Sequence, residues 1–251
     1  MCAWARGARA EHPLTGLVFS VSRLQSTSVG MVRNILRQNG LSLVLVALFS
    51  LCLMGQALTG HREYNHDRED HGEPSVGFGE YLRSAHFAEA TFENWESEFF
   101  QMGFYVLLTV FLVQKGSAES RSLDGVEDVD EDPRRHRNDP NAPGPVRRGG
   151  LALKLYEHSL SLAFLALFTL SFALHAASSL ELHNDALRNH GQPPVGVGAY
   201  LRSSQLWFES FQNWQSEFLA VVSIVVLSIF LRERGSPESK PVATPHGEHG
   251  S

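Results

Sequence analysis

Cysteine is scarce in this chain of 251 residues, which contains only Cys2 and Cys52. Cys52 lies inside a long apolar stretch and Cys2 lies next to the start, so the two residues give no disulfide framework. Motifs of common enzymes are also missing: we find no nucleophile paired with a base, no glycine-rich phosphate loop and no paired-cysteine metal motif. These absences argue against an enzyme, and we expect no cofactor.

Charged residues are missing from four apolar blocks, which span 41–59, 99–113, 160–180 and 218–231. All 21 Lys and Arg and all 27 Asp and Glu lie outside these blocks. The first and third blocks have about 20 residues, enough to cross a hydrocarbon core of about 30 Å. The second and fourth are shorter, but each extends back through a tryptophan, to give 95–114 and 214–231. The pattern predicts four transmembrane helices.

Lysine and arginine are unevenly distributed between the segments that flank these helices. Segments 1–40, 114–159 and 232–251 carry 5, 8 and 3 of them, whereas the loops 60–98 and 181–217 carry 3 and 2. Positively charged segments tend to stay on the cytoplasmic side of a membrane. We therefore expect both termini and the centre of the chain in the cytoplasm, with the two loops facing outward.

The chain contains an internal repeat, because residues 36–120 align without a gap with residues 155–239 and 34 of these 85 positions are identical. The copies share HGxPxVGxGxYLRS, FxNWxSEF and a final GSxES. Each copy holds two spans, so both copies have the same orientation, related by a pseudo-twofold axis along the membrane normal. The predicted fold is all-α, a four-helix transmembrane bundle of two tandem two-helix repeats packed through small residues such as Gly103 and Ala176.

Polar segments set the predicted domain boundaries. We expect membrane repeats at 31–116 and 151–236, a disordered cytoplasmic linker at 117–150, and disordered ends at 1–30 and 237–251. In the linker an acidic run precedes Arg134, Arg135 and Arg137. A docking site is one interpretation of this run, and a solvated tether is the simpler one. Translation that starts at Met31 would also fit the first boundary.

Asparagine and glutamate recur where the second helix of each copy meets the outer interface. Asn94 and Glu98, and in the second copy Asn213 and Glu217, lie one helical turn apart on one face. Across the pseudo-twofold axis these residues could form a ring of two carboxylates and two amides that attracts cations or takes up protons. Capping and snorkelling at the interface is the simpler alternative.

An amphipathic segment at 76–98 is predicted to form an interfacial helix that leads into the second span, with a counterpart in the second copy. The residues expected to anchor the helices at the interface are Tyr81, Arg83, Trp95, Tyr200, Arg202 and Trp214. An aromatic belt that fixes helix depth is favoured over a rim that gathers a ligand. The two arginines could bind lipid phosphates or the loop of the other copy.

Histidine offers only weak candidates for metal ligands. His61, His66 and His71 lie among acidic residues, but their spacing of five fits neither one helix face nor a common zinc pattern. Gln56 and His175 occupy equivalent positions near the outer ends of the first spans, where they could form an interhelical hydrogen bond or a shallow site. Because no charge lies at the midplane, a proton relay is disfavoured.

The chain resembles a family of bacterial integral membrane proteins of unknown function that share NGLSL, NWESEFFQMG, NWQSEFLAV and DEDPRRHR. The resemblance covers about residues 31–245 and implies a protein of the bacterial inner membrane, without catalytic residues. Three functions stay open: a scaffold or partner-binding protein, which we favour; a channel or small-solute carrier; and an extracytoplasmic sensor of metal or pH. The expected partners are the lipid bilayer and a membrane protein or second copy, with no nucleic acid.

The topology gives the first testable prediction. Reporters fused at about residues 70, 130 and 190 should report outside, inside and outside, because the linker carries the excess of Lys and Arg. Paired alkaline phosphatase and fluorescent protein fusions measure this. Any other pattern would contradict the proposed orientation.

Overall fold

The computed structural model describes the backbone of residues 13–122 and 127–248, and the side chains of this part from Asn34 onward. The described residues are helical and include no strand, so the all-α prediction is confirmed for them. The chain divides into two units, residues 1–71 and 72–251, and each is described by itself.

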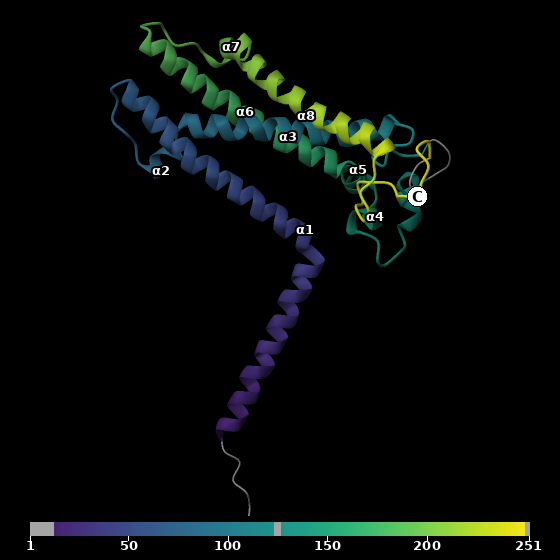
Figure 1. Cartoon of the computed structure of the whole chain (residues 1–251). Helices are drawn as coiled ribbons and strands as arrows, with labels where there is room; N and C mark the ends of the chain where they lie inside the picture. The colour runs from purple at the N-terminus through teal and green to yellow at the C-terminus, as the bar shows by residue number, and fades with distance from the viewer. Residues whose placement is uncertain (1–12, 123–126, 249–251) are drawn as a thin grey trace, which may run out of the picture. The chain divides into compact units, whose positions relative to one another are not determined.

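Unit 1 contains one long helix, α1 (Pro13–Asp70), which is interrupted at Asn39. There the backbone is non-helical (φ −124°, ψ 16°), the next residue is Gly40, and the ribbon bends (Figure 1). The Asn39 amide donates to the carbonyl of Ile35 at 3.2 Å. Within the segment 1–30, predicted to be disordered, residues from Pro13 belong to α1; residues 1–12 lie outside the described part.

Unit 2 contains the other elements. They are α2 (Phe78–Tyr81), α3 (Ala85–Phe111), the 3₁₀ helices η1 (Asp128–Asp130) and η2 (Pro133–His136), α4 (Gly144–Arg148), α5 (Gly150–Glu157), α6 (Ser159–Asn189), α7 (Val197–Tyr200) and α8 (Ser204–Phe230). Helix α3 lies against both α6 and α8 (Figure 1). A Cβ atom at Gly103 would lie 2.9 Å from the Cβ of Phe164, so α3 and α6 approach this closely because residue 103 is glycine.

Helix caps explain much of the repeated HGxPxVGxGxYLRS motif. Ser84 accepts a hydrogen bond from the Phe87 amide and begins α3, and Ser203 caps α8 in the same way. At the other end of the motif, Gly191 (φ +70°) ends α6, where Gln192 N–H bonds the Leu187 carbonyl. The single interfacial helix predicted for 76–98 is wrong, because the serine cap separates α2 from α3.

Among the residues whose side chains are described, three helices are long and apolar enough to cross a membrane by length and composition: Asn34–Asp70 within α1, α6 and α8. They contain three of the four apolar blocks, and most of their large apolar side chains are exposed. Helix α3 holds the remaining block and has the length of α8, but its N-terminal half carries Glu89, Glu93, Glu96 and Glu98. These glutamates set α3 apart from the three apolar helices.

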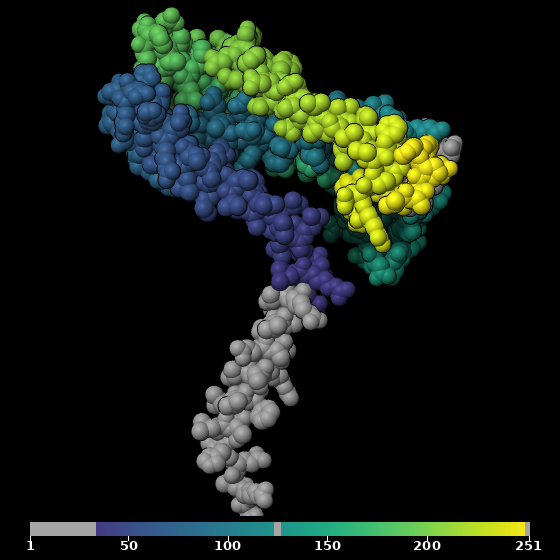
Figure 2. Space-filling model, in the orientation of Figure 1, coloured from purple at the N-terminus to yellow at the C-terminus, as the bar shows by residue number. Residues whose placement is uncertain are grey.

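The C-terminal tail, predicted to be disordered, lies at the end of unit 2 that also carries α4 and the linker (Figures 1 and 2). Lys240 is 2% exposed, and its ammonium donates to the carbonyls of Pro245, His246 and Glu248 at 3.2, 3.0 and 2.9 Å. Ser117 and Ser228 hydrogen-bond through their hydroxyls at 2.9 Å. The tail and the segment after α3 therefore meet near the end of α8.

Glu119 and Glu238 hold matching positions of the two GSxES motifs, and their carboxyl groups hydrogen-bond. Burial, followed by the contact with Glu238, raises the pKa of Glu119. A carboxyl whose pKa is higher in the folded state stabilises that state at low pH, and the contribution is lost as the pH rises through the raised pKa.

Raising the pH from about 5 to about 8 should therefore loosen the tail, because two neighbouring carboxylates repel each other. Hydrogen exchange of residues 236–248 measures this. Glu119→Gln should remove most of the pH dependence, whereas Glu233→Gln, with an exposed side chain in the same segment, should keep it. Equal pH dependence in wild type and Glu119→Gln would refute the assignment.

Candidate functional site

The most buried polar contact of unit 2 joins α3 to α6. His175 Nδ1 lies 2.6 Å from Glu96 Oε2, and both side chains are fully buried. The second oxygen of Glu96 accepts a hydrogen bond from the indole N–H of Trp214 on α8, at 3.0 Å. A buried carboxylate is costly unless it is paired and hydrogen-bonded. Glu96 therefore fixes the positions of two neighbouring helices.

A second carboxyl group approaches the other side of the imidazole. Glu209 Oε2 on α8 lies 3.6 Å from His175 Nε2 and accepts a hydrogen bond from the Ser179 hydroxyl at 3.0 Å. Ser179 in turn lies 2.5 Å from the hydroxyl of Tyr200 on α7. Because Ser179 donates its own proton to Glu209, it accepts a hydrogen bond from the Tyr200 hydroxyl. Burial raises the pKa of Tyr200 to about 12. The side chain of Glu209 is 21% exposed, which gives the site an accessible edge.

Two further glutamates of α3 complete the group, which we name the acidic cluster: Glu89, Glu93, Glu96, His175 and Glu209. Glu89, Glu93 and Glu96 lie on one helix face, at i, i+4 and i+7. Glu93 accepts a hydrogen bond from the Asn213 amide at 2.6 Å, and Glu89 hydrogen-bonds with Ser179. All three helices thus contribute polar groups to the cluster.

The acidic cluster combines four carboxyl groups with one imidazole. Helices α3, α6 and α8 contain only one Lys or Arg, Arg188, in the last turn of α6. Only Glu96 and His175 are fully buried, and the other three carboxyl groups are partly exposed. Four carboxylates around a single imidazole repel one another, and bound protons or a cation would relieve that repulsion. Within the described residues no group of three or more His, Cys, Asp or Glu is arranged to hold a metal ion.

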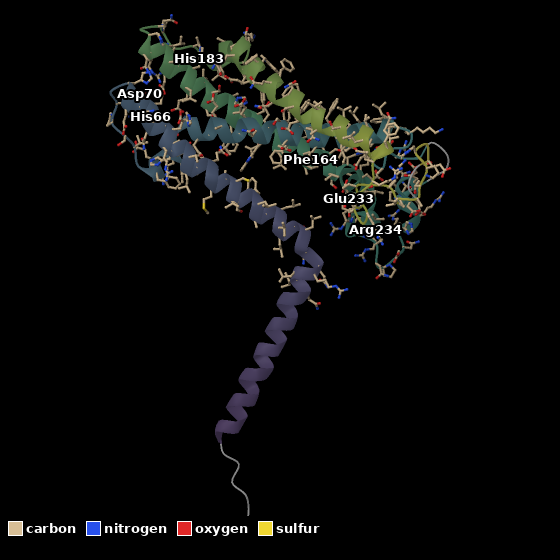
Figure 3. All side chains as sticks on the ribbon, viewed as in Figure 1. His66, Asp70, Phe164, His183, Glu233 and Arg234 are labelled. Carbon is tan, nitrogen blue, oxygen red and sulfur yellow. The ribbon has the colours of Figure 1, made fainter. Side chains whose placement is uncertain are left out.

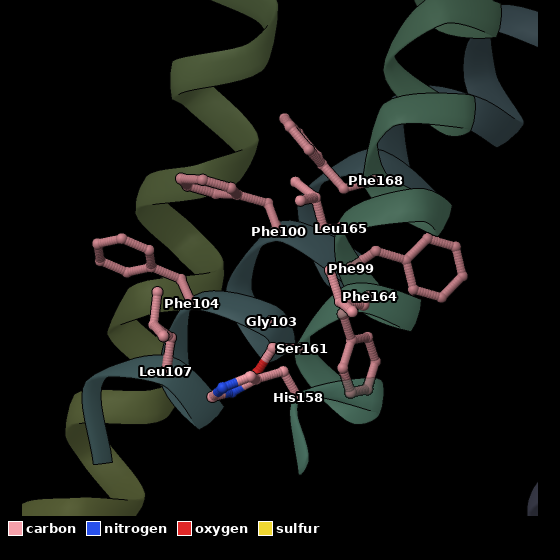
Figure 4. Close-up of a pocket in the computed structure, with 11 residues that line it drawn as sticks. Phe99, Phe100, Gly103, Phe104, Leu107, His158, Ser161, Phe164, Leu165 and Phe168 are labelled. Atoms are coloured by element: carbon pink, nitrogen blue, oxygen red, sulfur yellow. The ribbon is translucent and has the colours of Figure 1, made fainter. Parts of the chain in front are cut away.

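Aromatic rings close the cluster toward the other end of the bundle. The Phe100 ring centroid lies 4.4 Å from Trp214, 5.2 Å from Phe168 and 5.7 Å from Phe218. Beyond these rings, α3 and α6 line a partly open cavity of about 310 Å³ that begins at Phe100 and Phe168 and extends to His158 (Figure 4). Apolar side chains therefore separate the cluster from the end of α6 that adjoins α5.

The structure distributes the residues of the predicted Asn/Glu ring differently. Glu98 and Glu217 lie near enough to interact electrostatically. Asn213 instead binds Glu93, and Asn94 donates to the Ala90 carbonyl of its own helix at 2.8 Å. The two amides thus do not bridge Glu98 and Glu217, and only Asn213 contacts the acidic cluster.

The predicted interfacial anchors fall into two groups. Arg83 and Arg202 are exposed, in the turns before α3 and α8. Tyr81 and Tyr200 are each only 1% exposed, and Tyr200 packs with Ala176 and Leu206 in a small apolar core. Trp95 and Trp214 are partly buried, and Trp214 belongs to the site rather than to a surface belt.

The three histidines of the weak metal hypothesis lie on α1. His66 and His71 pair with acids one helical turn away, at 4.0 Å to Asp70 and 3.6 Å to Asp67, with both pairs exposed (Figure 3). His61 Nε2 lies 3.0 Å from the Asn65 amide. Each histidine thus has its contact within one turn of the same helix.

Sequence reasoning missed most of the acidic cluster and named only His175 as a polar residue of a span. Two signals could have found the rest. Glu89, Glu93 and Glu96 have helical spacing on one face, and Glu209 lies one turn before Asn213. The expectation that a proton relay is disfavoured rests only on charges at the membrane midplane and takes no account of Glu96.

Comparison with known proteins places most of the chain in one family. Residues 32–251 match the family described as "Domain of unknown function (DUF6766)". No curated protein and no solved structure matches the chain. The family match agrees with the resemblance in its range and in its unknown function, and it brings no activity with it.

Replacing Glu96 should destabilise the protein. Glu96→Ala leaves His175 Nδ1 and Trp214 Nε1 buried without their acceptor, which should lower the free energy of unfolding by about 2 kcal/mol or more. Denaturant titration in detergent micelles measures this. The matched control Glu98→Ala removes an exposed carboxylate two residues away and should change stability by less than about 0.5 kcal/mol. Similar effects of both changes would contradict the buried contact.

Proposed function

The chain belongs to the family described as a domain of unknown function (DUF6766), and from the buried polar contacts of unit 2 we propose that the protein is a proton-linked membrane carrier. Its proton-binding site is the acidic cluster. The proposal includes an inner-membrane location, both termini in the cytoplasm, and four spans formed by Asn34–Asp70, α3, α6 and α8. The supporting observation is the fully buried pair of His175 and Glu96, with Glu209 on the other side of the ring.

The tandem arrangement of two repeats is part of the proposal, and local geometry at positions 119 residues apart supports it. His158 (φ −112°, ψ 10°) interrupts the helix at the position that matches Asn39. Other matched features are the glycines with positive φ at 72 and 191 and at 116 and 235, and the serine caps at 84 and 203. Matched breaks and caps are expected if each copy folds as the same two-helix unit.

The free-energy cost of ionisable side chains in a membrane favours a functional role for the cluster. Ionisable side chains within spanning helices are rare because each costs several kcal/mol without a partner. One hydrogen-bonded pair would be enough to join α3 to α6. The added carboxyl groups of Glu89, Glu93 and Glu209 raise the local negative charge, so they destabilise the cluster unless it binds protons or cations.

Access to the cluster differs between its two sides. On the α7 side, Glu209 is partly exposed and receives a hydrogen bond from Gln205, whose side chain is exposed. On the opposite side the rings of Phe100, Phe168 and Phe218 cover the cluster. Alternating access requires a site that opens to one side of the membrane at a time. The expected orientation places the open side outside.

Of the three functions considered from the sequence, this proposal takes the carrier class in place of the favoured scaffold. The cluster that carries it differs from the Asn/Glu ring, since it uses Glu96 and His175 rather than Asn94 and Glu98. The histidine-based sensor receives less support, because His66 and His71 form exposed pairs within one helix.

The proposal predicts a buried carboxyl group that titrates. Infrared difference spectra recorded across a pH series should show the carbonyl stretch of a protonated, buried carboxylic acid, distinct from those of exposed acids. Glu96→Gln should remove or shift this band, and Glu209→Gln should change its midpoint, because both groups share the imidazole. The exposed control Glu98→Gln should leave the band unchanged.

Two results would overturn the proposal. A wild-type protein without a titrating buried carboxyl band would show that the cluster does not exchange protons. The same conclusion would follow if the band survived unchanged in each of the single variants Glu93→Gln, Glu96→Gln and Glu209→Gln.

A further inference from the structure

We propose that the cavity between α3 and α6 binds the apolar part of a lipophilic organic cation, and that such a cation is the substrate exchanged for protons. This inference rests on the proposed carrier function and names its substrate class. The cavity lies outside the hydrogen-bond network of the acidic cluster, so its chemistry is a separate observation.

The cavity is apolar and large enough for a group of several rings. Its volume is about 310 Å³, and its walls are aromatic and aliphatic side chains of α3 and α6. Phe99, Phe104 and Phe164 supply rings, and Gly103 leaves the wall without a side chain between them (Figure 4). Only His158 and Ser161 add polar atoms. Cavities of this composition bind hydrophobic groups and select among ligands with a few polar contacts.

The end of the cavity near Phe100 is coupled to the acidic cluster. Phe100 lines the cavity, and its ring centroid lies 4.4 Å from that of Trp214. The indole N–H of Trp214 donates a hydrogen bond to Glu96 Oε1 at 3.0 Å. A hydrogen bond from the indole N–H to a carboxylate increases the negative charge on the face of the ring. Aromatic faces of this kind bind organic ammonium groups. The rings between cavity and cluster thus favour positive charge.

The distribution of charge selects a cation over an anion or a neutral chain. No lysine or arginine lines the cavity, and the polar residue His158 stands at the end remote from Phe168 (Figure 4). Glu96, Glu93 and Glu209 lie beyond Phe100 and Trp214 and impose a negative potential on that end. A ligand with bulky apolar groups and a delocalised positive charge fits both the apolar wall and the negative potential at this end. A weakly hydrated cation also loses little hydration free energy on leaving water.

Cation and proton binding should oppose each other. A protonated cluster has lost part of the negative charge that attracts the cation, so the bound cation displaces a proton: protonated protein plus cation gives protein–cation complex plus proton. The charge is balanced in this exchange without any further reactant. Reciprocal coupling of this kind requires that acidification weaken cation binding by the factor by which the cation weakens proton binding.

The test uses two ions of the same size and shape with opposite charge, tetraphenylphosphonium and tetraphenylborate. Calorimetry on the full-length protein in detergent should show that the cation binds at least about tenfold more tightly than the anion. Titration in buffers of different ionisation enthalpy should show proton release on binding. Equal affinity for both ions would mean that the cavity takes any apolar group, such as a lipid chain, and would overturn the inference.

Two variants locate the bound cation. Ser161→Phe should fill the cavity and weaken cation binding at least about tenfold, whereas the matched Ser42→Phe, at the equivalent position of the first copy, should bind like wild type. Glu96→Gln tests the charge and should also weaken cation binding. Cation binding that Ser161→Phe leaves unchanged would place the ligand elsewhere and sink the inference.

The infrared titration separates failure of this inference from failure of the carrier proposal. Ser161→Phe should keep the buried carboxyl band, which also shows that the variant is folded. A wild-type protein that titrates but binds no tetraphenylphosphonium retains its proton site and refutes the substrate class alone. A protein that shows neither property refutes both.

Discussion

The hydrogen bond between His175 and Glu96 constrains the rest of unit 2, because it must be kept out of contact with lipid and water alike. Its 2.6 Å length requires that α3 and α6 approach closely. About two turns further along α3, glycine at position 103 allows the same close approach. The second oxygen of Glu96 then fixes Trp214 and with it the rotation of α8. The aromatic contacts of Phe100 follow from that rotation. One buried carboxyl group thus couples the three long helices.

Elements that depend on local chemistry could be predicted from the sequence. Uncharged stretches identified the apolar helices, and the motif that ends in YLRS marked the segment where α3 and α8 begin, although the capping role of Ser84 and Ser203 was not recognised. The C-terminal tail could not be predicted, because its order comes from Lys240 and three carbonyl groups that its composition does not indicate. The same holds for the contact between Ser117 and Ser228, which are far apart in the chain.

The acidic cluster escaped prediction for a different reason. Identity between the two copies directed attention to Asn94, Glu98, Asn213 and Glu217, whereas the cluster consists of positions at which the copies differ. Glu96 aligns with a glutamine, His175 with a glutamine and Glu209 with an alanine. Shared residues such as Ser84 cap helices, a task that both copies need. Residues that differ give unit 2 a single acidic cluster in place of two symmetric ones.

Tyr200 links this site to the surface of the protein. It lies on the short helix α7, outside the long helices, yet its hydroxyl reaches Ser179 and through it Glu209. Nearby, Asn184 holds the loop before α7 through both the N–H and the carbonyl of Val195. Binding effects between two sites are reciprocal. Under the proposed function, a protein that binds this loop with different affinity in the two protonation states of the cluster would therefore shift the proton affinity of the cluster, so the loop offers an antibody fragment an allosteric site.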